Sequence, residues 1–570
     1  MSNKPIIEFE NFTFQYFSQA EPTLKNINLK IYPGEKVLIV GPSGSGKSTL
    51  GHCLNGLIPF SYKGEIGGSL KINGLESKEQ NIFKLSKMVG TVLQDSDGQF
   101  VGITVGEDIA FALENDCIPT EEMRERVKKV AKIVDMENWL ASSPYELSGG
   151  QKQRTALGGV MIDDVDILLF DEPLANLDPA TGKSAIEIID SIHKQSNKTI
   201  VIIEHRLEDV LHCDVDRIIL VHDGGILADM KPDDLLASSI LKENGIREPL
   251  YITALKYAGL DITPEMKAGH IETLTLSQEQ KSKVIAWHKS IAKKSKAEEK
   301  VSILKMENVS FSYDGVNRIL NDVSFDIKEG EMISIVGKNG AGKSTLSKVI
   351  CGFVKEDEGN VYYCGENIKN KSIKERAENI GIVMQNPNQM ISKPMIFDEV
   401  ALGLRLRGVT EDEITERVEK VLKICGLAPF KTWPISALSY GQKKRVTIAS
   451  ILVLNPKVII LDEPTAGQDY HHYSEIMDFL KELNSQGVTI IMITHDMHLM
   501  LEYTPRAIAI AGGRKIEDAS SSVILTNKEV IKEANLKETS LYTLATLVGI
   551  EDGTSFVQGF IDYERLVESR

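Results

Sequence analysis

Two glycine-rich loops constrain this chain more than any other feature, because one short motif occurs twice. GPSGSGKSTL occupies residues 41–50, and GKNGAGKSTL occupies residues 337–346. Both fit G-x-x-x-x-G-K-[ST], in which glycines let backbone N–H groups wrap closely around phosphates. The lysine places a positive charge on the β- and γ-phosphates, and the next hydroxyl offers an oxygen to Mg²⁺. The residues expected to contact nucleotide in these loops are Gly41, Pro42, Ser43, Gly44, Ser45, Gly46, Lys47, Ser48 and Thr49, and Gly337, Lys338, Asn339, Gly340, Ala341, Gly342, Lys343, Ser344 and Thr345.

The two loops belong to a longer internal repeat, in which short stretches recur in the same order about half a chain apart. Lys47 recurs as Lys343, and His205 recurs as His495. A chain of 570 residues exceeds what one core normally holds, so two similar halves are expected. The expected domains are residues 1–244, a partly helical connector at 245–300, residues 301–525, and a C-terminal appendage at 526–570 to which no role is assigned.

Each half alternates strand-like and helix-like patterns, which indicates an α/β fold. The stretches KVLIV and MISIV lead into the loops, and DILLF, TIVII, VIILD and TIIMI follow later in the two halves. Such continuously apolar stretches are typical of strands buried on both faces of a parallel sheet. Between them lies a polar section with helical periodicity, whose apolar stripes are Met123, Val127, Val130 and Val134, and Ile414, Val418, Val421 and Cys425.

A pair of carboxylates ends one apolar strand in each half. These pairs are Asp171–Glu172 and Asp462–Glu463. Adjacent side chains at a strand end point in different directions, so two roles are available. We expect the aspartate to hold the Mg²⁺ shell and the glutamate to polarise the attacking water.

Composition excludes several classes of function. The net charge is −16, with 65 basic and 81 acidic residues, which argues against a broad nucleic-acid footprint. No apolar run approaches the roughly 18 to 20 residues of a membrane span. The six cysteines are scattered without a metal-binding spacing, and the first residues, MSNKPIIEFENF, do not resemble a secretory signal. We therefore expect a cytosolic protein that needs neither zinc nor disulfides and has no broad nucleic-acid surface.

The stretches LSGGQ at 147–151 and LSYGQ at 438–442 make the chain resemble a tandem ATP-binding-cassette (ABC) ATPase. The resemblance implies two P-loop domains, each with a mostly parallel sheet, an N-terminal antiparallel β section and a helical signature subdomain. It further implies that Tyr16 and Tyr313 stack on adenine and that Gln94 and Gln385 contact Mg²⁺ and a membrane subunit. By the same resemblance, Asp178 and Asp469 link the two active sites, and His205 and His495 contact the γ-phosphate.

In this family neither loop forms a complete site, which explains the repeat. The signature of one half closes over nucleotide held by the other half, so the two halves pair within one chain. The helix start at Ser148, Gly149 and Gly150 is a suitable anion site for this purpose. We expect Lys47 and Glu172 to work against Ser439 and Gly441, and Lys343 and Glu463 against Ser148 and Gly150. Tyr440 departs from the usual signature glycine, which leaves the rate of the first site open.

Two further stretches resemble energy-coupling factor (ECF) importers of vitamins and metal ions. They are QDSDGQFVGITVGEDIAFAL at 94–113 and QNPNQMISKPMIFDEVALGL at 385–404, and EHRLEDV after the first histidine strengthens the match. The resemblance implies integral membrane partners, for coupling and for substrate binding, and a peripheral position on the cytoplasmic side of the cell membrane. An apolar stripe is expected to form part of a groove for a coupling helix or to pack the helical subdomain: Ile109, Ala110 and Leu113, and Val400, Ala401 and Leu404.

Two alternatives remain open at this stage. One is a soluble tandem ATPase acting on ribosomes, which the short connector and the acidic composition disfavour. The other is a regulator that binds ATP without turnover, which the intact Glu172 and Glu463 disfavour. The transported solute is not encoded here, since another polypeptide selects it in such systems.

Overall fold

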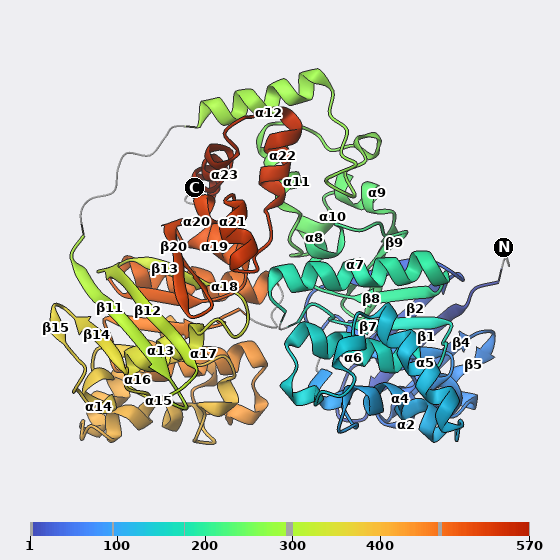
Figure 1. Ribbon diagram of the computed structural model, residues 1–570, viewed down its shortest axis with the longest axis horizontal. Coiled ribbons are helices and arrows are strands. Elements are labelled where there is room, and N and C mark those ends of the chain that lie inside the picture. Colours follow the sequence, from blue (N-terminus) through green and yellow to red (C-terminus); the bar gives the residue numbers. More distant parts are fainter. Residues whose placement is uncertain (1–3, 94–95, 176, 292–299, 466–469, 569–570) are drawn as a thin grey trace. The chain divides into compact units, whose positions relative to one another are not determined.

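The computed structural model describes residues 4–93, 96–175, 177–291, 300–465 and 470–568 (Figure 1). The chain divides into two compact units, Met1–Trp287 and His288–Arg570. Each unit contains one antiparallel sheet and one mostly parallel sheet within its described residues. The α/β fold expected for both halves is confirmed.

The mostly parallel sheet of the first unit has the strand order β10-β9-β3-β8-β7-β6. Strand β3 lies between β8 and β9 and is parallel to both, while β10 is antiparallel to β9. Every residue of β3 and β8 is buried, as expected for apolar strands covered on both faces. The strands are β3 (Lys36–Val40), β6 (Val89–Val92), β7 (Ile167–Asp171), β8 (Thr199–Ile203), β9 (Arg217–His222) and β10 (Gly225–Met230).

The antiparallel sheet of this unit has the order β2-β1-β4-β5. Its strands are β1 (Ile7–Tyr16), β2 (Leu24–Ile31), β4 (Gly64–Ile72) and β5 (Leu75–Glu76). Alternate side chains of β1, including Phe12 and Phe14, join a core that also contains Ile39 and Leu169 of the parallel sheet. The two sheets therefore share one core, and the end of β1 is held close to the phosphate-binding loop.

Two helices of the first unit, α4 and α6, begin with capping boxes, and α6 starts within the LSGGQ stretch. Helix α4 begins with a capping box at Thr104 and Glu107, and α6 begins with one at Ser148 and Gln151. The helices are α1 (Lys47–Leu54), α2 (Leu57–Phe60), α3 (Ile82–Ser86), α4 (Val105–Asn115), α5 (Thr120–Ile133), α6 (Gly149–Met161), α7 (Pro179–Ser196), α8 (Leu207–Val210), α9 (Pro232–Ala237), α10 (Ile240–Glu243) and α11 (Leu250–Tyr257).

Residues after 244 continue to pack in the first unit. The side chain of Tyr251 on α11 is buried, and its hydroxyl donates to the carbonyl of Ala268 at 2.6 Å. Helix α12 (Gln278–Ser290) contributes the buried Val284 and Trp287. Residues 245–287 therefore bury apolar side chains and belong to the first unit, which ends at Trp287.

The second unit repeats this architecture. Its mostly parallel sheet has the order β16-β17-β18-β13-β19-β20, and its antiparallel sheet has the order β12-β11-β14-β15. The strands are β11 (Ser302–Ser312), β12 (Arg318–Lys328), β13 (Met332–Val336), β14 (Glu358–Tyr363), β15 (Glu366–Asn367), β16 (Ile380–Val383), β17 (Val458–Asp462), β18 (Thr489–Ile493), β19 (Arg506–Ala511) and β20 (Arg514–Ser520). Strand β13 lies between β18 and β19, in the place that β3 has in the first unit.

Helices of the second unit form a helical layer and a C-terminal group. Helices α15, α16 and α17 share a separate apolar core that includes Val400, Val418 and Val446. At the C-terminus, α22 and α23 bury Leu544 and Phe556. The helices are α13 (Lys343–Cys351), α14 (Ile373–Arg376), α15 (Ile396–Arg405), α16 (Glu411–Ile424), α17 (Tyr440–Leu452), α18 (Tyr470–Ser485), α19 (Met497–Tyr503), α20 (Ser521–Ile524), α21 (Lys528–Glu533), α22 (Ser540–Val548) and α23 (Gly553–Glu568).

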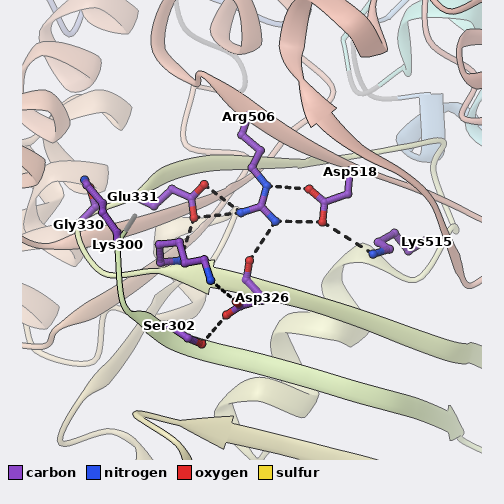
Figure 2. Close-up of polar contacts among 9 residues, drawn as sticks. Lys300, Ser302, Asp326, Gly330, Glu331, Arg506, Lys515 and Asp518 are labelled. Atoms are coloured by element: carbon purple, nitrogen blue, oxygen red, sulfur yellow. Dashed lines mark hydrogen bonds and ion pairs between the residues drawn. The ribbon is translucent and has the colours of Figure 1, made fainter. Parts of the chain in front are cut away.

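A network around Arg506 ties the two sheets of the second unit together (Figure 2). The guanidinium donates to Asp518 on β20 at 2.7 and 2.9 Å and to Glu331, just before β13, at 3.0 and 3.1 Å. It also donates to the backbone carbonyl of Asp326 on β12 at 3.0 Å. Arg217 makes the corresponding contacts in the first unit, with Asp229, Glu35 and the carbonyl of Lys30. The network fixes the antiparallel sheet, which carries Tyr313 near its end, to the sheet that carries the phosphate-binding loop.

No helix in the described ranges has both the length and the apolar character needed to cross a membrane.

Candidate functional site

The first phosphate-binding loop connects β3 to α1. Gly41 adopts φ 158° and Gly46 adopts φ 104°. A Cβ at Gly41 would lie 2.1 Å from the carbonyl oxygen of Val221, so no larger residue fits without moving the backbone. The buried Lys47 donates through Nζ to the carbonyls of Gly41 and Pro42, both at 2.8 Å. These bonds hold the ammonium over the loop in which the sequence predicts phosphate binding.

The second loop repeats this arrangement between β13 and α13. A Cβ at Gly337 would lie 2.0 Å from the carbonyl oxygen of Ile510. Lys343 Nζ donates to the carbonyls of Gly337 at 2.7 Å and Lys338 at 3.0 Å. Gly340 has open space where a side chain would point. In both units the loop leads into the N-terminus of a helix whose first residue is the lysine. Such a helix N-terminus with a lysine beside it is a suitable site for phosphate.

In the first unit, Glu172 follows β7 and lies against His205. Its φ of 49° is rare for a residue with a side chain, and its N–H donates to the carbonyl of Ile203 at 2.8 Å. Glu172 Oε1 lies 2.8 Å from His205 Nε2. Burial by itself raises the pKa of Glu172, but the hydrogen bond and charge of His205, with Lys47, bring the pKa below its usual value. The carboxylate is therefore ionised at neutral pH and able to accept a proton.

Asp171, at the end of β7, has a different environment. Burial raises its pKa to about 6, with further increases from the charges of Glu172 and Glu204. Its Oδ1 is buried, and no hydrogen-bond partner for that atom lies among the described residues. A buried carboxylate oxygen without a partner is unfavourable unless a cation is bound to it.

In the second unit, the carboxylates of Asp462 and Glu463 each have a hydrogen-bond partner within the site. Ser344 Oγ donates to Asp462 Oδ2 at 3.0 Å, so the two expected metal ligands already adjoin. Glu463 adopts φ 47°, and its Oε1 lies 2.7 Å from His495 Nδ1. The glutamate and the histidine therefore meet in both units, through opposite ring nitrogens. Thr494 adds a weak donor, 3.5 Å from Glu463 Oε2.

Two buried residues near the carboxylates were not anticipated from the sequence. Glu204, the counterpart of Thr494, accepts from the N–H groups of His205 at 3.2 Å and of Leu174 at 3.3 Å, and burial raises its pKa. Lys444, the counterpart of Gln153, is buried beside Glu463, and burial lowers its pKa to about 8. Their positions in the stretches IIEHR and GQKKR are the only sequence signal for them.

The two tyrosines assigned to adenine lie at the ends of the antiparallel sheets. Tyr16 is the last residue of β1, and its hydroxyl lies 3.3 Å from Thr49 Oγ1. Tyr313 follows β11, and its hydroxyl lies 3.4 Å from Thr345 Oγ1. Each ring is thereby next to the helix that leaves the phosphate-binding loop. The first site has an additional aromatic neighbour, Tyr62, whose ring centre is 6.3 Å from that of Tyr16.

The signature residues stand at helix starts, as expected. Ser148 caps α6 and Ser439 caps α17, while Gly149 and Gly150 form the first turn of α6. Gly441 is the second residue of α17, after Tyr440, whose side chain lies outside the described residues.

The remaining motif residues are only partly described. Asp178 is buried and caps α7 by accepting from the N–H of Thr181 at 2.9 Å. Gln385 follows β16, and its carbonyl accepts a hydrogen bond from Lys444. Gln94 and Asp469 lie outside the described residues.

The apolar stripe expected to line a groove or to pack the helical subdomain is buried. All six of its side chains are at most 9% exposed, and those on α15 belong to the core of the helical layer. The packing alternative therefore holds at all six positions, and these side chains do not line a groove. Exposed apolar side chains are found nearby in the first unit, at Val101, Ile103 and Phe111.

Comparison with known families agrees with this geometry. A profile described as ABC transporter matches residues 24–175 and 320–466. A profile described as ATP-binding cassette cobalt transporter matches residues 238–311.

Similar proteins occur in several bacteria. A putative ABC transporter ATP-binding protein of Clostridium perfringens is 63% identical over 99% of both chains. One of Photobacterium profundum is 56% identical over 98% of this chain and 99% of that protein. One of Enterococcus faecalis is 57% identical over 99% of both. The solved structure of cbiO1 from Clostridium perfringens, described as part of the ABC transporter complex cbiONQ, is 38% identical, with a TM-score of 0.38; the match covers 41% of this chain and 94% of that one.

Proposed function

Because this chain belongs to the ATP-binding proteins of ABC transporters and is an ATPase, we propose that it powers solute uptake through separate membrane subunits. One observation carries the proposal for turnover. Glu172, after β7, is hydrogen-bonded to His205 at 2.8 Å, and Glu463, after β17, is hydrogen-bonded to His495 at 2.7 Å. Both halves thus keep the glutamate and histidine that hydrolysis needs, which supports two working sites.

The residues divide the reaction between them. Lys47 and Lys343 neutralise the phosphate chain of ATP, and Tyr16 and Tyr313 stack on the adenine. Glu172 and Glu463 each accept a proton from the attacking water, which aligns the water with the γ-phosphorus. His205 and His495 orient these carboxylates and face the γ-phosphate.

The donor set fits Mg²⁺, which prefers hydroxyl and carboxylate oxygens. The ligands would be Ser48 and Asp171 in the first site and Ser344 and Asp462 in the second, with Gln94 and Gln385 also assigned from the sequence. The buried Oδ1 of Asp171 and the contact between Ser344 and Asp462 support this fit. When bound, Mg²⁺ neutralises charge on the β- and γ-phosphates.

Each site is completed by the other half. The N–H groups at the start of α6, after Ser148, serve the nucleotide of the second loop. Those at the start of α17, after Ser439, serve the nucleotide of the first loop. ATP therefore closes the halves on each other, and hydrolysis releases them.

The class of transporter is proposed on two grounds. The match of residues 238–311 to a profile described as ATP-binding cassette cobalt transporter favours an importer of the ECF type, for metal ions or vitamins. The exposed Val101, Ile103 and Phe111 offer an apolar surface to a membrane subunit on the cytoplasmic side.

The test is capture of the tagged full-length chain from detergent-solubilised membranes of its own host. We expect integral membrane proteins in stoichiometric amounts, and ATP-dependent accumulation of ⁵⁷Co²⁺ or a labelled vitamin when they are reconstituted together in vesicles. Capture of ribosomal particles without a membrane protein would contradict the proposal. The double variant V101D/I103D should lose the membrane partner while retaining ATP binding.

A further inference from the structure

A buried lysine of the second unit joins two parts of its catalytic site to the signature helix α17. Lys444 lies on α17, five residues after the signature serine, and is 1% exposed. Its Nζ donates to the carbonyls of Met384 at 2.9 Å and Gln385 at 2.8 Å, and to that of Glu463 at 3.5 Å. One ammonium group therefore connects the signature helix, the segment after β16 and the residue after β17.

These three contacts account for the full donor capacity of the side chain. An ammonium has three N–H donors, and burial of its charge is unfavourable unless they are bonded. Two of them reach backbone carbonyls at 2.8 and 2.9 Å, and the third makes a weaker contact with the carbonyl of Glu463 at 3.5 Å. The ammonium therefore links the backbone that bears the Glu463 carboxylate to the segment after β16.

The first unit has a different contact at this position. Gln153 stands at the corresponding position of α6, and its amide donates to the carbonyl of Pro173. That contact joins the helix to the segment after β7, but it brings no positive charge. Arg376, another buried cation of the second unit, bonds the carbonyls of Val349 and Ile350 at the end of α13 and is thus structural.

We propose that Lys444 is a positioning residue of the second site, which holds the backbone of Glu463 and Gln385 against the signature helix so that the Glu463 carboxylate stays aligned on His495. The inference rests on the proposed role of Glu463. It makes the second site dependent on a charged junction, where the first site has the neutral Gln153.

The experiment uses the full chain carrying E172Q, so that turnover reports the second site. K444Q introduces the residue that the first unit has at this position, and K443Q, on the neighbouring lysine, is the matched control. We expect K444Q to lower kcat at least tenfold while the Kd for ATP stays within twofold, and K443Q to change neither more than twofold. K444R keeps cationic donors and should lose less turnover than K444Q. If K444Q does not fold, K444R is measured in the same two assays, with kcat lowered and Kd unchanged.

A second measurement separates positioning from a general structural effect. In the E172Q/E463Q chain, K444Q should lower the remaining single-turnover rate by less than threefold, because its effect passes through the Glu463 carboxylate. The proposal is overturned if K444Q changes kcat less than threefold, if ATP affinity falls in proportion, or if the loss is just as large in the E463Q background. If adding E463Q to the E172Q chain leaves turnover intact, the assignment of Glu463 as the base fails instead.

Discussion

Replacement of Arg506 by methionine tests how much the half-buried network around this guanidinium stabilises the second unit. The side chains of Glu331 and Asp518, which share this guanidinium, are 14% and 20% exposed. A hydrogen bond to a charged group stabilises by about 1.5–3 kcal/mol, and partial exposure favours the lower end. Two such partners give an expected loss of about 3 kcal/mol in the free energy of unfolding.

Arg318 provides a matched control within the same unit. It also makes a two-pronged contact with a carboxylate, Glu358, at 2.7 and 3.2 Å, but both side chains are about half exposed, at 48% and 58%. R318M should therefore cost less than about 1 kcal/mol. The two variants compare the same chemistry at different burial.

The assay is urea unfolding of the full chain, followed by the fluorescence of Trp433. W139F and W287F remove the two tryptophans of the first unit, so the signal reports the second unit. With a slope of about 3 kcal/mol/M, R506M should shift the midpoint down by about 1 M. Equal shifts for R506M and R318M would refute the argument that burial strengthens the network. Combined with D518N, R506M should show a coupling of about 1.5 kcal/mol in a double-mutant cycle.

Three other predictions concern the nucleotide sites. Because the pKa of Asp171 is raised to about 6 in the folded protein, the stability that its protonated form contributes is lost as pH rises through that value. In buffer without metal or nucleotide, D171N should raise the free energy of unfolding by about 2 kcal/mol at pH 7 and by almost nothing at pH 4, and a destabilised variant at pH 7 would contradict this. Y313A should weaken ATP binding, measured by equilibrium dialysis, about tenfold, and Y313W should restore it, since stacking needs only an aromatic face; an Ala variant that binds like wild type would remove Tyr313 from the site. G441D places a carboxylate at the start of α17, so in an E463Q background it should lower ATPase activity about a hundredfold while ATP binding to the chain persists, and unchanged activity would argue against a shared site.

Local motifs determined most of what could be predicted. Residues that are neighbours in sequence define these motifs. They include the phosphate-binding loops, the apolar strands β3, β7 and β8 with their counterparts, and the glutamates that directly follow β7 and β17. Glu172 follows β7 and His205 follows β8, and these strands are adjacent, so the two side chains meet in the structure. The opposite ring nitrogens of His205 and His495 could not be predicted, because the ring orientation depends on packing.

Contacts between distant segments were beyond the sequence pattern. In the sequence, Lys444 is an ordinary helical lysine. Its contacts with the carbonyls of Gln385 and Glu463 depend on where β16 and β17 lie in the fold. The stripe beginning at Ile109 was ambiguous for the same reason, since a helical period shows that one face is apolar but not what covers it. Exposed Ile103, in the preceding loop, has no periodic signal at all.

If Glu172 and Glu463 are the bases of a two-site ATPase, steady-state hydrolysis by the E172Q/E463Q chain must fall. We expect kcat to fall by about two to four orders of magnitude, with ATP still bound at wild-type affinity, because only the proton acceptor is removed. Hydrolysis by the double variant at the wild-type rate would contradict this assignment.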